Sequence, residues 1–360
     1  MRIHNNGSKA VIRWLYAGLF MVFAMVIIGA VTRLTESGLS ITEWKVASGT
    51  IPPLTQEDWL GEFMKYQQTP EYINKNMGMT LDEFKQIFFW EWFHRFWGRL
   101  IGVVFLVPFF IFWRKGYLKG NFAVRLVFIF ILGGFQAFLG WWMVKSGLAY
   151  EPRVSHYRLA IHLSTALLLF GLIWWTILDI KYKRLTHLRN KFPGGKRLFK
   201  IGFVILCLQI VYGAFVAGRD AGQEMNTWPL MDGEFVKTGA FSEEGRPFYY
   251  NIIGEPIPDA ADPHQGFPNN GGIQFIHRWL AFVVYFWVWA LWFYGRSRHV
   301  RNDQMSALNL LLLLVHAQLA LGIFTLLYNV PIVLGVLHQA GAVFLLMCAL
   351  YFYHQLRGTE

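Results

Sequence analysis

The chain has 360 residues, of which 55% are hydrophobic and 15% charged, and its mean hydropathy is +0.35. This composition is typical of an integral membrane protein and excludes an ordinary soluble domain. The net charge of +11 would suit nucleic-acid binding, but the placement of the basic residues along the chain excludes that function too.

Eight apolar segments are long enough to cross a bilayer, which takes about 20 residues. In chain order they are 11–32, 87–113, 122–144, 157–178, 199–218, 272–295, 306–328 and 331–355. Two long connections separate them, 33–86 and 219–271, and the first is expected to end in a capped helix start at 79–84. The sequence therefore predicts an all-α integral membrane protein with eight transmembrane helices.

The charges of the connections alternate along the chain. Connection 114–125 holds four Lys/Arg residues and no acid, and 179–200 holds eight against one acid. The long connection 33–86 has five basic and eight acidic residues, and 219–271 has three and nine. By the positive-inside rule we expect a multi-pass protein of a bacterial plasma membrane, with both termini cytoplasmic and both long connections outside.

The two halves of the chain share motifs in the same order. The matched pairs are Gly29 with Gly213, Glu36 with Asp220, Gly38 with Gly222, Trp44 with Trp228, His94 with His277, Gln136 with Gln318, Gly140 with Gly322 and His162 with His338. The offset drifts slowly from 184 to 176 residues. This pattern predicts a tandem repeat, with residues 1–180 and 181–360 as two pseudo-symmetric four-helix bundles side by side.

Four histidines lie singly near the outer ends of four predicted spans: His94, His162, His277 and His338. Each lies roughly 7–11 Å deep, at 1.5 Å of helix rise per residue. A lone buried imidazole in lipid is costly, and facing pairs of histidines can hold heme iron in a helical bundle. Each half is therefore predicted to bind one heme iron, although a hydrogen-bonded structural role is the alternative for any single histidine. The other seven histidines are predicted not to be ligands, with His156 the nearest of them to the site.

Glu91 is the only carboxylate within any predicted span, and its counterpart is Gln274. The three-residue spacing puts Glu91 on the helix face of His94. The first half is thus predicted to combine iron ligands with an acid/base group, and the second to be an electron carrier. A plain ion pair of Glu91 with Arg95 or Arg99 is the alternative.

Arg95 and Arg278 follow two of the histidines directly. They could hold heme propionates or reach lipid phosphates, and both alternatives stay open. Gln136 and Gln318 are predicted to join neighbouring helices. Cys207 and Cys348 lie within apolar spans and are predicted to be small apolar side chains of the helices rather than a disulfide or redox pair.

Several long stretches resemble the heme A synthase family, an eight-span family that completes heme A for terminal oxidases. The stretches are TRLTESGLSITEWK, GMTLDEFKQIFFWEWFHRFWGRLIG, YRLAIHLSTAL, GAFVAGRDAG, FIHRW and LGVLHQAGAV. The resemblance covers nearly the whole chain. The long outer connections are similar to those of the proteobacterial and mitochondrial branch, and the loop cysteine pair of Gram-positive members is missing here.

The resemblance implies oxidation of the C8 methyl of heme O to a formyl group by successive hydroxylations. It implies a permanent heme b on His277 and His338, the substrate heme on His94 and His162, and an essential glutamate at Glu91. That carboxylate would stabilise a developing cation or move protons. Heme O synthase, an electron acceptor, terminal oxidase assembly factors, the lipid bilayer and a homo-oligomer are the expected partners, with no nucleic acid.

Two other functions compete with this one. A diheme electron-transfer cytochrome would need no acid in one half only, so the difference between Glu91 and Gln274 favours the oxidase. A transporter or heme carrier would predict spans broken near the repeat interface. Pro108 is the main such interruption in the sequence, which makes this the weakest hypothesis.

Overall fold

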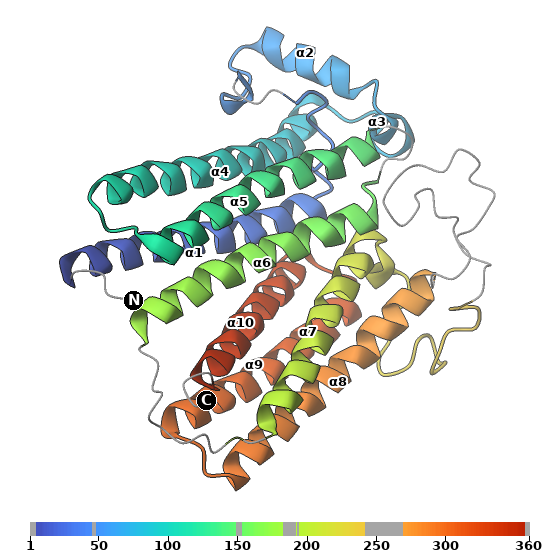
Figure 1. The fold of residues 1–360 in the computed structure, drawn as a ribbon. Helices are drawn as coiled ribbons and strands as arrows, with labels where there is room; N and C mark the ends of the chain where they lie inside the picture. Colours follow the sequence, from blue (N-terminus) through green and yellow to red (C-terminus); the bar gives the residue numbers. More distant parts are fainter. Residues whose placement is uncertain are drawn as a thin grey trace.

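The structure is a computed structural model that describes residues 5–44, 48–148, 153–182, 192, 194–241 and 269–356. Within these ranges it contains eight helices that are long and apolar enough to cross a membrane (Figure 1). They are α1 (Asn5–Leu34), α4 (Leu81–Arg114), α5 (Gly120–Gly147), α6 (His156–Lys181), α7 (Gly195–Gly218), α8 (Asn270–Ser297), α9 (Asn302–Leu327) and α10 (Ile332–Leu356). Each predicted span lies within one of these helices or extends at most one residue beyond it, which confirms the all-α, eight-span prediction.

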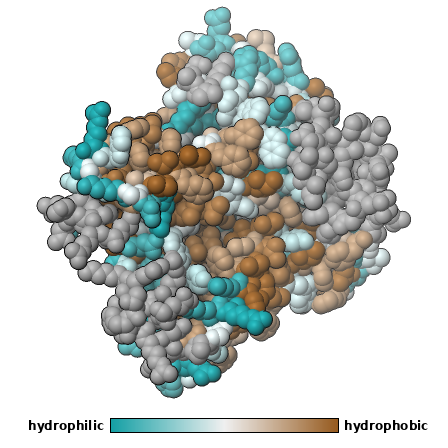
Figure 2. Space-filling model, in the orientation of Figure 1, coloured by the Kyte–Doolittle hydropathy of each residue, from teal (hydrophilic) through white to brown (hydrophobic). Residues whose placement is uncertain are grey.

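The outward surface of these helices is apolar. On α5, Phe128, Ile131 and Phe135 are each about half or more exposed, and Figure 2 shows broad hydrophobic patches over the helical body. In water such a surface would be unfavourable, whereas lipid solvates it, and helices satisfy their own backbone groups there. The chain is therefore a multi-pass membrane protein.

Three shorter elements lie in the first long connection: η1 (Ser48–Thr50), α2 (Gln56–Tyr66) and α3 (Pro70–Asn74). Thr55 and Thr69 cap the two helices through their hydroxyl oxygens. The aromatic side chains of Phe63 and Tyr66 pack on Phe84 at the start of α4. This outer cap, residues 48–74, therefore rests on the beginning of a membrane helix.

The start of α4 follows the sequence prediction. Thr80 and Glu83 form a capping box, in which the side chain of each residue accepts a hydrogen bond from the backbone N–H of the other. The helix then runs without a break through Pro108 to Arg114. The capped start at 79–84 is confirmed, and it puts Glu91 and His94 about three turns inside the helix.

The long helices form two sets of neighbours, α1 with α4, α5 and α6, and α7 with α8, α9 and α10 (Figure 1). The sets meet through α1, α6, α7 and α10. Trp174 of α6 donates to the Met347 carbonyl at 3.0 Å, and Gln339 of α10 donates to the Val26 carbonyl at 3.1 Å. The predicted boundary after residue 180 adjoins 183–191, which lies outside the described residues, so the division into two domains stays a prediction.

Candidate functional site

His277 of α8 and His338 of α10 face each other across the second set of helices. Their ring centroids are 6.4 Å apart and the rings are nearly perpendicular, at 82°. Two imidazoles on opposite sides of one metal have centroids roughly 6 Å apart, because each metal–nitrogen bond is roughly 2 Å long. The pair therefore fits a single heme iron.

His94 of α4 and His162 of α6 form the corresponding pair in the first set. They lie close enough to influence each other electrostatically. Among the described residues there is no cluster of three or more His, Cys, Asp or Glu side chains that could hold a metal ion. Two imidazoles are the donor set that axial ligation of a porphyrin iron requires.

Each of the four imidazoles lies against a glycine of a neighbouring helix. A Cβ at Gly29 would lie 3.3 Å from His94 Nε2; at Gly140, 3.1 Å from His162 Cε1; at Gly213, 3.1 Å from His277 Cε1; and at Gly322, 2.9 Å from His338 Cε1. Contacts this short would force the ring to move. The four matched glycines therefore leave the space in which the rings lie.

Two glutamine amides hold two of these histidines. Gln136 Nε2 donates to the His162 carbonyl at 2.8 Å and lies 3.1 Å from its Nδ1. Gln318 Nε2 makes the same contacts with His338 at 2.9 and 3.2 Å. The predicted helix-joining role is confirmed, and the helix that each amide joins is the one that carries a candidate ligand.

Gln209 is a residue that sequence comparison of the halves did not find. Its Nε2 donates to the carbonyl of His277 at 3.0 Å. The offset of 184 residues places Met25 at its counterpart in the first half. Because the repeat has no matching amide there, only the packing of α7 on α8 reveals this contact.

Glu91 is 3% exposed and has three hydrogen-bond donors. Its Oε2 accepts from Ser40 Oγ and from the Ile41 backbone N–H, both at 2.8 Å, and its Oε1 accepts from Arg95 at 2.5 Å. The ion pair with Arg95 is therefore present, together with two contacts to the outer connection. These donors fix the carboxylate in one position beside the face of α4 that carries His94.

Gln274 is 2% exposed in the second half, and its amide contacts the second outer connection instead. Its Nε2 donates to the Ala221 carbonyl at 2.7 Å. An amide neither ionises nor exchanges a proton with a substrate in the way that a carboxylate does. The two buried positions thus differ in the one property that acid/base chemistry needs.

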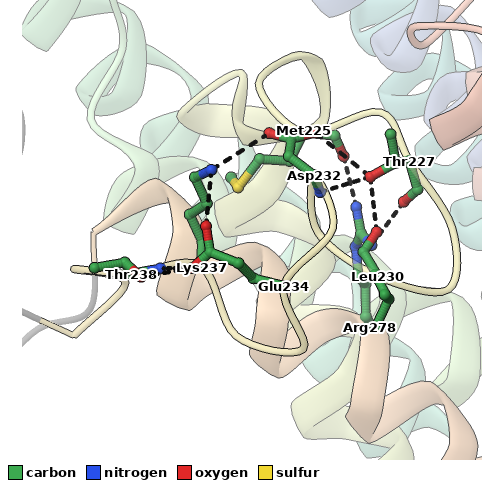
Figure 3. A network of polar contacts seen from close by, with 8 residues as sticks. All are labelled: Met225, Thr227, Leu230, Asp232, Glu234, Lys237, Thr238 and Arg278. Carbon is green, nitrogen blue, oxygen red and sulfur yellow. Dashed lines mark hydrogen bonds and ion pairs between the residues drawn. The ribbon is translucent and has the colours of Figure 1, made fainter.

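Arg95 and Arg278 bind the outer connections at matching positions. Arg95 donates to the carbonyls of residues 41 and 43 at 3.2 and 3.3 Å, and Arg278 to those of residues 225 and 227 at 2.5 and 2.9 Å (Figure 3). The acceptors in the second half lie 184 residues after those in the first, which is the offset of the repeat in this region. Each guanidinium also lies over a tryptophan, Trp44 at 4.8 Å or Trp228 at 5.9 Å. Both arginines therefore hold the outer connections against the helices.

The remaining polar residues of interest have other surroundings. His156 is 4% exposed and its ring lies 4.0 Å from that of Tyr157 and 5.5 Å from that of Phe215. Cys207 and Cys348 are both free thiols. The expectation that the cysteines form no disulfide is confirmed.

Comparison with known proteins places these residues in a family. Residues 12–350 match the family model COX15-CtaA, described as cytochrome oxidase assembly protein. The heme A synthase of Rhodospirillum centenum is 44% identical over 359 residues, which cover 98% of this chain and 90% of the relative. The heme A synthase of Flavobacterium johnsoniae is 40% identical over 352 residues, covering 97% and 98%. The heme A synthase of Rhizobium meliloti is 44% identical over 351 residues, covering 96% and 89%.

Proposed function

We propose that this chain, which belongs to the COX15-CtaA family of cytochrome oxidase assembly proteins, oxidises the C8 methyl of heme O to the formyl group of heme A. It is a heme A synthase, a membrane oxidoreductase that converts heme O to heme A. We further propose the site residues, their roles and a resident heme b.

The observation that carries the proposal is the pairing of two similar sites with one chemical difference. His94 and His162 would hold the substrate heme, and His277 and His338 would hold heme b, which accepts and passes on electrons. The separation of 6.4 Å between the His277 and His338 rings supports ligation of one iron. Glu91 accompanies the first pair and Gln274 the second, which supports chemistry in residues 1–180 and electron transfer in 181–360.

Glu91 has the role of an acid/base or charge-stabilising group in this proposal. Converting a methyl to a formyl group removes protons together with electrons, so a carboxylate near the reacting carbon can accept protons or stabilise positive charge there. The donors Ser40, Ile41 and Arg95 hold the carboxylate in place, so it need not reorganise during the reaction. Arg95 and Arg278 are the candidates for contact with heme propionates.

The orientation in the membrane follows from the charge distribution. The basic connections would be cytoplasmic and the sites would lie near the outer face of a bacterial plasma membrane. Heme O synthase as supplier, a separate electron acceptor, terminal oxidase assembly factors as recipients and a homo-oligomer complete the proposal.

One experiment tests the function against the diheme cytochrome. The protein is expressed in cells that supply heme O, and the extracted pigments are identified by mass. Heme A or its hydroxylated precursor is expected, whereas heme b alone would favour the electron-transfer cytochrome.

The Glu91→Gln variant tests the site within the same assay. We expect loss of product by at least about 100-fold, the size of a general acid/base contribution, with an unchanged spectrum of the heme on His277 and His338. Glu83→Gln, which changes a carboxylate of the same helix at its exposed N-terminal cap, is the control. A Glu91→Gln variant that still makes heme A would remove Glu91 from the mechanism.

A further inference from the structure

We propose that an opening beside the first site binds the propionate carboxylates of the substrate porphyrin through Lys145, and that the matching place in the second half is closed. This difference would make the first porphyrin exchangeable and the second permanent. The inference rests on the proposed function, because it names how the substrate site differs from the heme b site.

The opening is a pocket of about 240 Å³ between the first outer connection and the outer end of α5. Thr42 and Trp44 line it from the connection, Arg95 from α4, and Val144 and Lys145 from α5. Arg95 is also the partner of Glu91, and Val144 and Lys145 follow Gly140, on which His162 packs, by about one turn. The pocket therefore adjoins α4, which carries His94, and α5, whose Gly140 packs on His162 of α6.

Arg95, which also pairs with Glu91, and Lys145 are the basic residues of the pocket lining. The Arg95 guanidinium lies 4.8 Å from the ring centroid of Trp44, and the Lys145 ammonium lies 5.5 Å from that of Trp141. Lys145 is exposed. The acid among the lining residues, Glu43, forms an ion pair with Lys65 at 3.1 Å. A pocket with two cations held by aromatic rings suits a carboxylate ligand, and a porphyrin carries such groups on one edge.

In the described part of the second half, a side chain joins the two elements that border this place. Asn226, the counterpart of Thr42, donates from Nδ2 to the Leu326 carbonyl at 2.9 Å and to the Gly222 carbonyl at 2.8 Å. Leu326 is the counterpart of Val144, and Leu327 stands where the first half has Lys145. The second outer connection is thus joined to the end of α9, and the cation of the first half is replaced by an apolar residue.

This difference matches what the two sites must do. A substrate has to enter and its product has to leave, so its polar edge needs an accessible cationic contact. A resident heme gains from a closed covering that slows its loss. The halves otherwise share the arginine, the tryptophan and both histidines.

The first test measures porphyrin binding to the full-length protein that holds its resident heme. Iron protoporphyrin IX is titrated into wild type, Lys145→Ala and Lys145→Arg, and again as its dimethyl ester, in which both carboxylates are blocked. We expect Lys145→Ala to weaken binding of the diacid about five-fold, as for one partly exposed ion pair, and to leave binding of the ester unchanged. Lys145→Arg should bind like wild type.

Lys85→Ala is the matched control, because Lys85 also lies over a tryptophan, Trp59 at 6.0 Å, but outside the pocket. Equal diacid binding by wild type and Lys145→Ala would overturn this inference alone. A wild type that takes up no second porphyrin, or one whose uptake survives His162→Ala, would overturn the proposed substrate site as well.

The second test removes the contact between the second outer connection and α9 and measures the loss of the resident heme. Asn226→Ala removes the hydrogen bond to the Leu326 carbonyl at the end of α9, together with the one to Gly222 of the connection. We expect transfer of the resident heme to an apo-globin acceptor to become at least about five-fold faster. Asn309→Ala, which removes an amide that binds Trp292 at 2.7 Å, is the control. An unchanged transfer rate in Asn226→Ala would overturn the claim that this contact retains the heme.

Discussion

The ring of His338 is held by two small features of α9. Gln318 contacts its carbonyl and its Nδ1, and Gly322 leaves room for its Cε1. Both residues recur in the first half as Gln136 and Gly140 around His162. A histidine that is oriented in this way loses less entropy when it binds a metal.

Gly322→Ala is expected to displace this ring. A Cβ there would lie 2.9 Å from His338 Cε1, so either the imidazole or the helix must shift. Changes to the residues that orient a metal ligand cost metal sites about 10-fold or more in affinity. Heme content after purification and the low-spin absorption spectrum would measure this loss. Gly133→Ala, whose Cβ would meet nothing within 4 Å, should leave both unchanged. Normal heme content in Gly322→Ala would mean that the glycine does not position the ligand.

Gln318→Leu is expected to change the heme without displacing a helix. It removes the donor at His338 while keeping a side chain of similar size, so the imidazole becomes free to rotate. We expect a shifted reduction potential and heme binding weakened about 10-fold, measured by redox titration. Gln339→Leu removes a comparable partly buried hydrogen bond, to the Val26 carbonyl, and should leave the potential unchanged. Equal potentials in Gln318→Leu and wild type would exclude a tuning role.

At this scale the sequence was informative where the repeat duplicates a residue or changes it. The four histidines, the two glutamines and the contrast of Glu91 with Gln274 all follow from aligning the halves. Gln209, Asn226 and Lys145 could not be found in this way, because each has an unlike residue at its counterpart. Their roles depend on which neighbouring helix faces them, and that is a property of packing.

The outer cap is the element whose stability should respond to pH. Glu71 of α3 is 3% exposed and accepts a hydrogen bond from the Tyr66 hydroxyl at 3.1 Å. Burial raises the pKa of Glu71 from its ordinary 4.5 to about 7, with the Glu91 charge adding to the rise and the Tyr66 bond opposing it. The folded cap therefore binds this proton more tightly than the unfolded chain does. Its stability is highest below about pH 4.5 and falls as the pH rises to about 7.

Glu71→Gln should remove this dependence, because the amide stays neutral. We expect hydrogen exchange of the backbone amides of 56–74 to be slower in the variant than in wild type at pH 8 and similar at pH 5. Glu57→Gln, an exposed change on α2, is the control. If the exchange rate of the variant relative to wild type is the same at both pH values, Glu71 does not set the pH dependence of the cap's stability.

The elements themselves differed in how far the sequence predicted them. The long helices follow from hydropathy, and the start of α4 follows from its capping box at Thr80 and Glu83. The helices α2 and α3 were not predicted, although Thr55 with Asp58 and Thr69 with Pro70 are ordinary helix starts. Short polar helices have no hydropathy signal, and their position over α4 depends on a few aromatic contacts.

On the scale of the whole molecule, the two sets of helices are joined near their outer ends by charge. Asp220 at the end of α7 accepts from Arg33 of α1 at 2.6 Å and forms an ion pair with Arg153 at 3.3 Å. Its counterpart Glu36 pairs instead with Lys75 of the first half, at 3.1 Å. Both acids have the left-handed backbone conformation, with φ of 54° and 51°. The repeat predicts the shared conformation but not that one acid reaches across to the other half.

Asp220→Asn is expected to loosen the contact between the two sets of helices. Asparagine tolerates the left-handed conformation, so the backbone is kept while the charge that pairs with Arg33 and Arg153 is lost. With partly buried ion pairs worth about 1 kcal/mol each, we expect the free energy of unfolding to fall by about 1–2 kcal/mol. Thermal denaturation in detergent, followed through the heme absorption, would measure it, and the loss should shrink at high salt. Glu36→Asn makes the same change where the partner lies within one half, and should cost less than half as much. Equal losses in the two variants would show that the contact between the halves does not depend on Asp220.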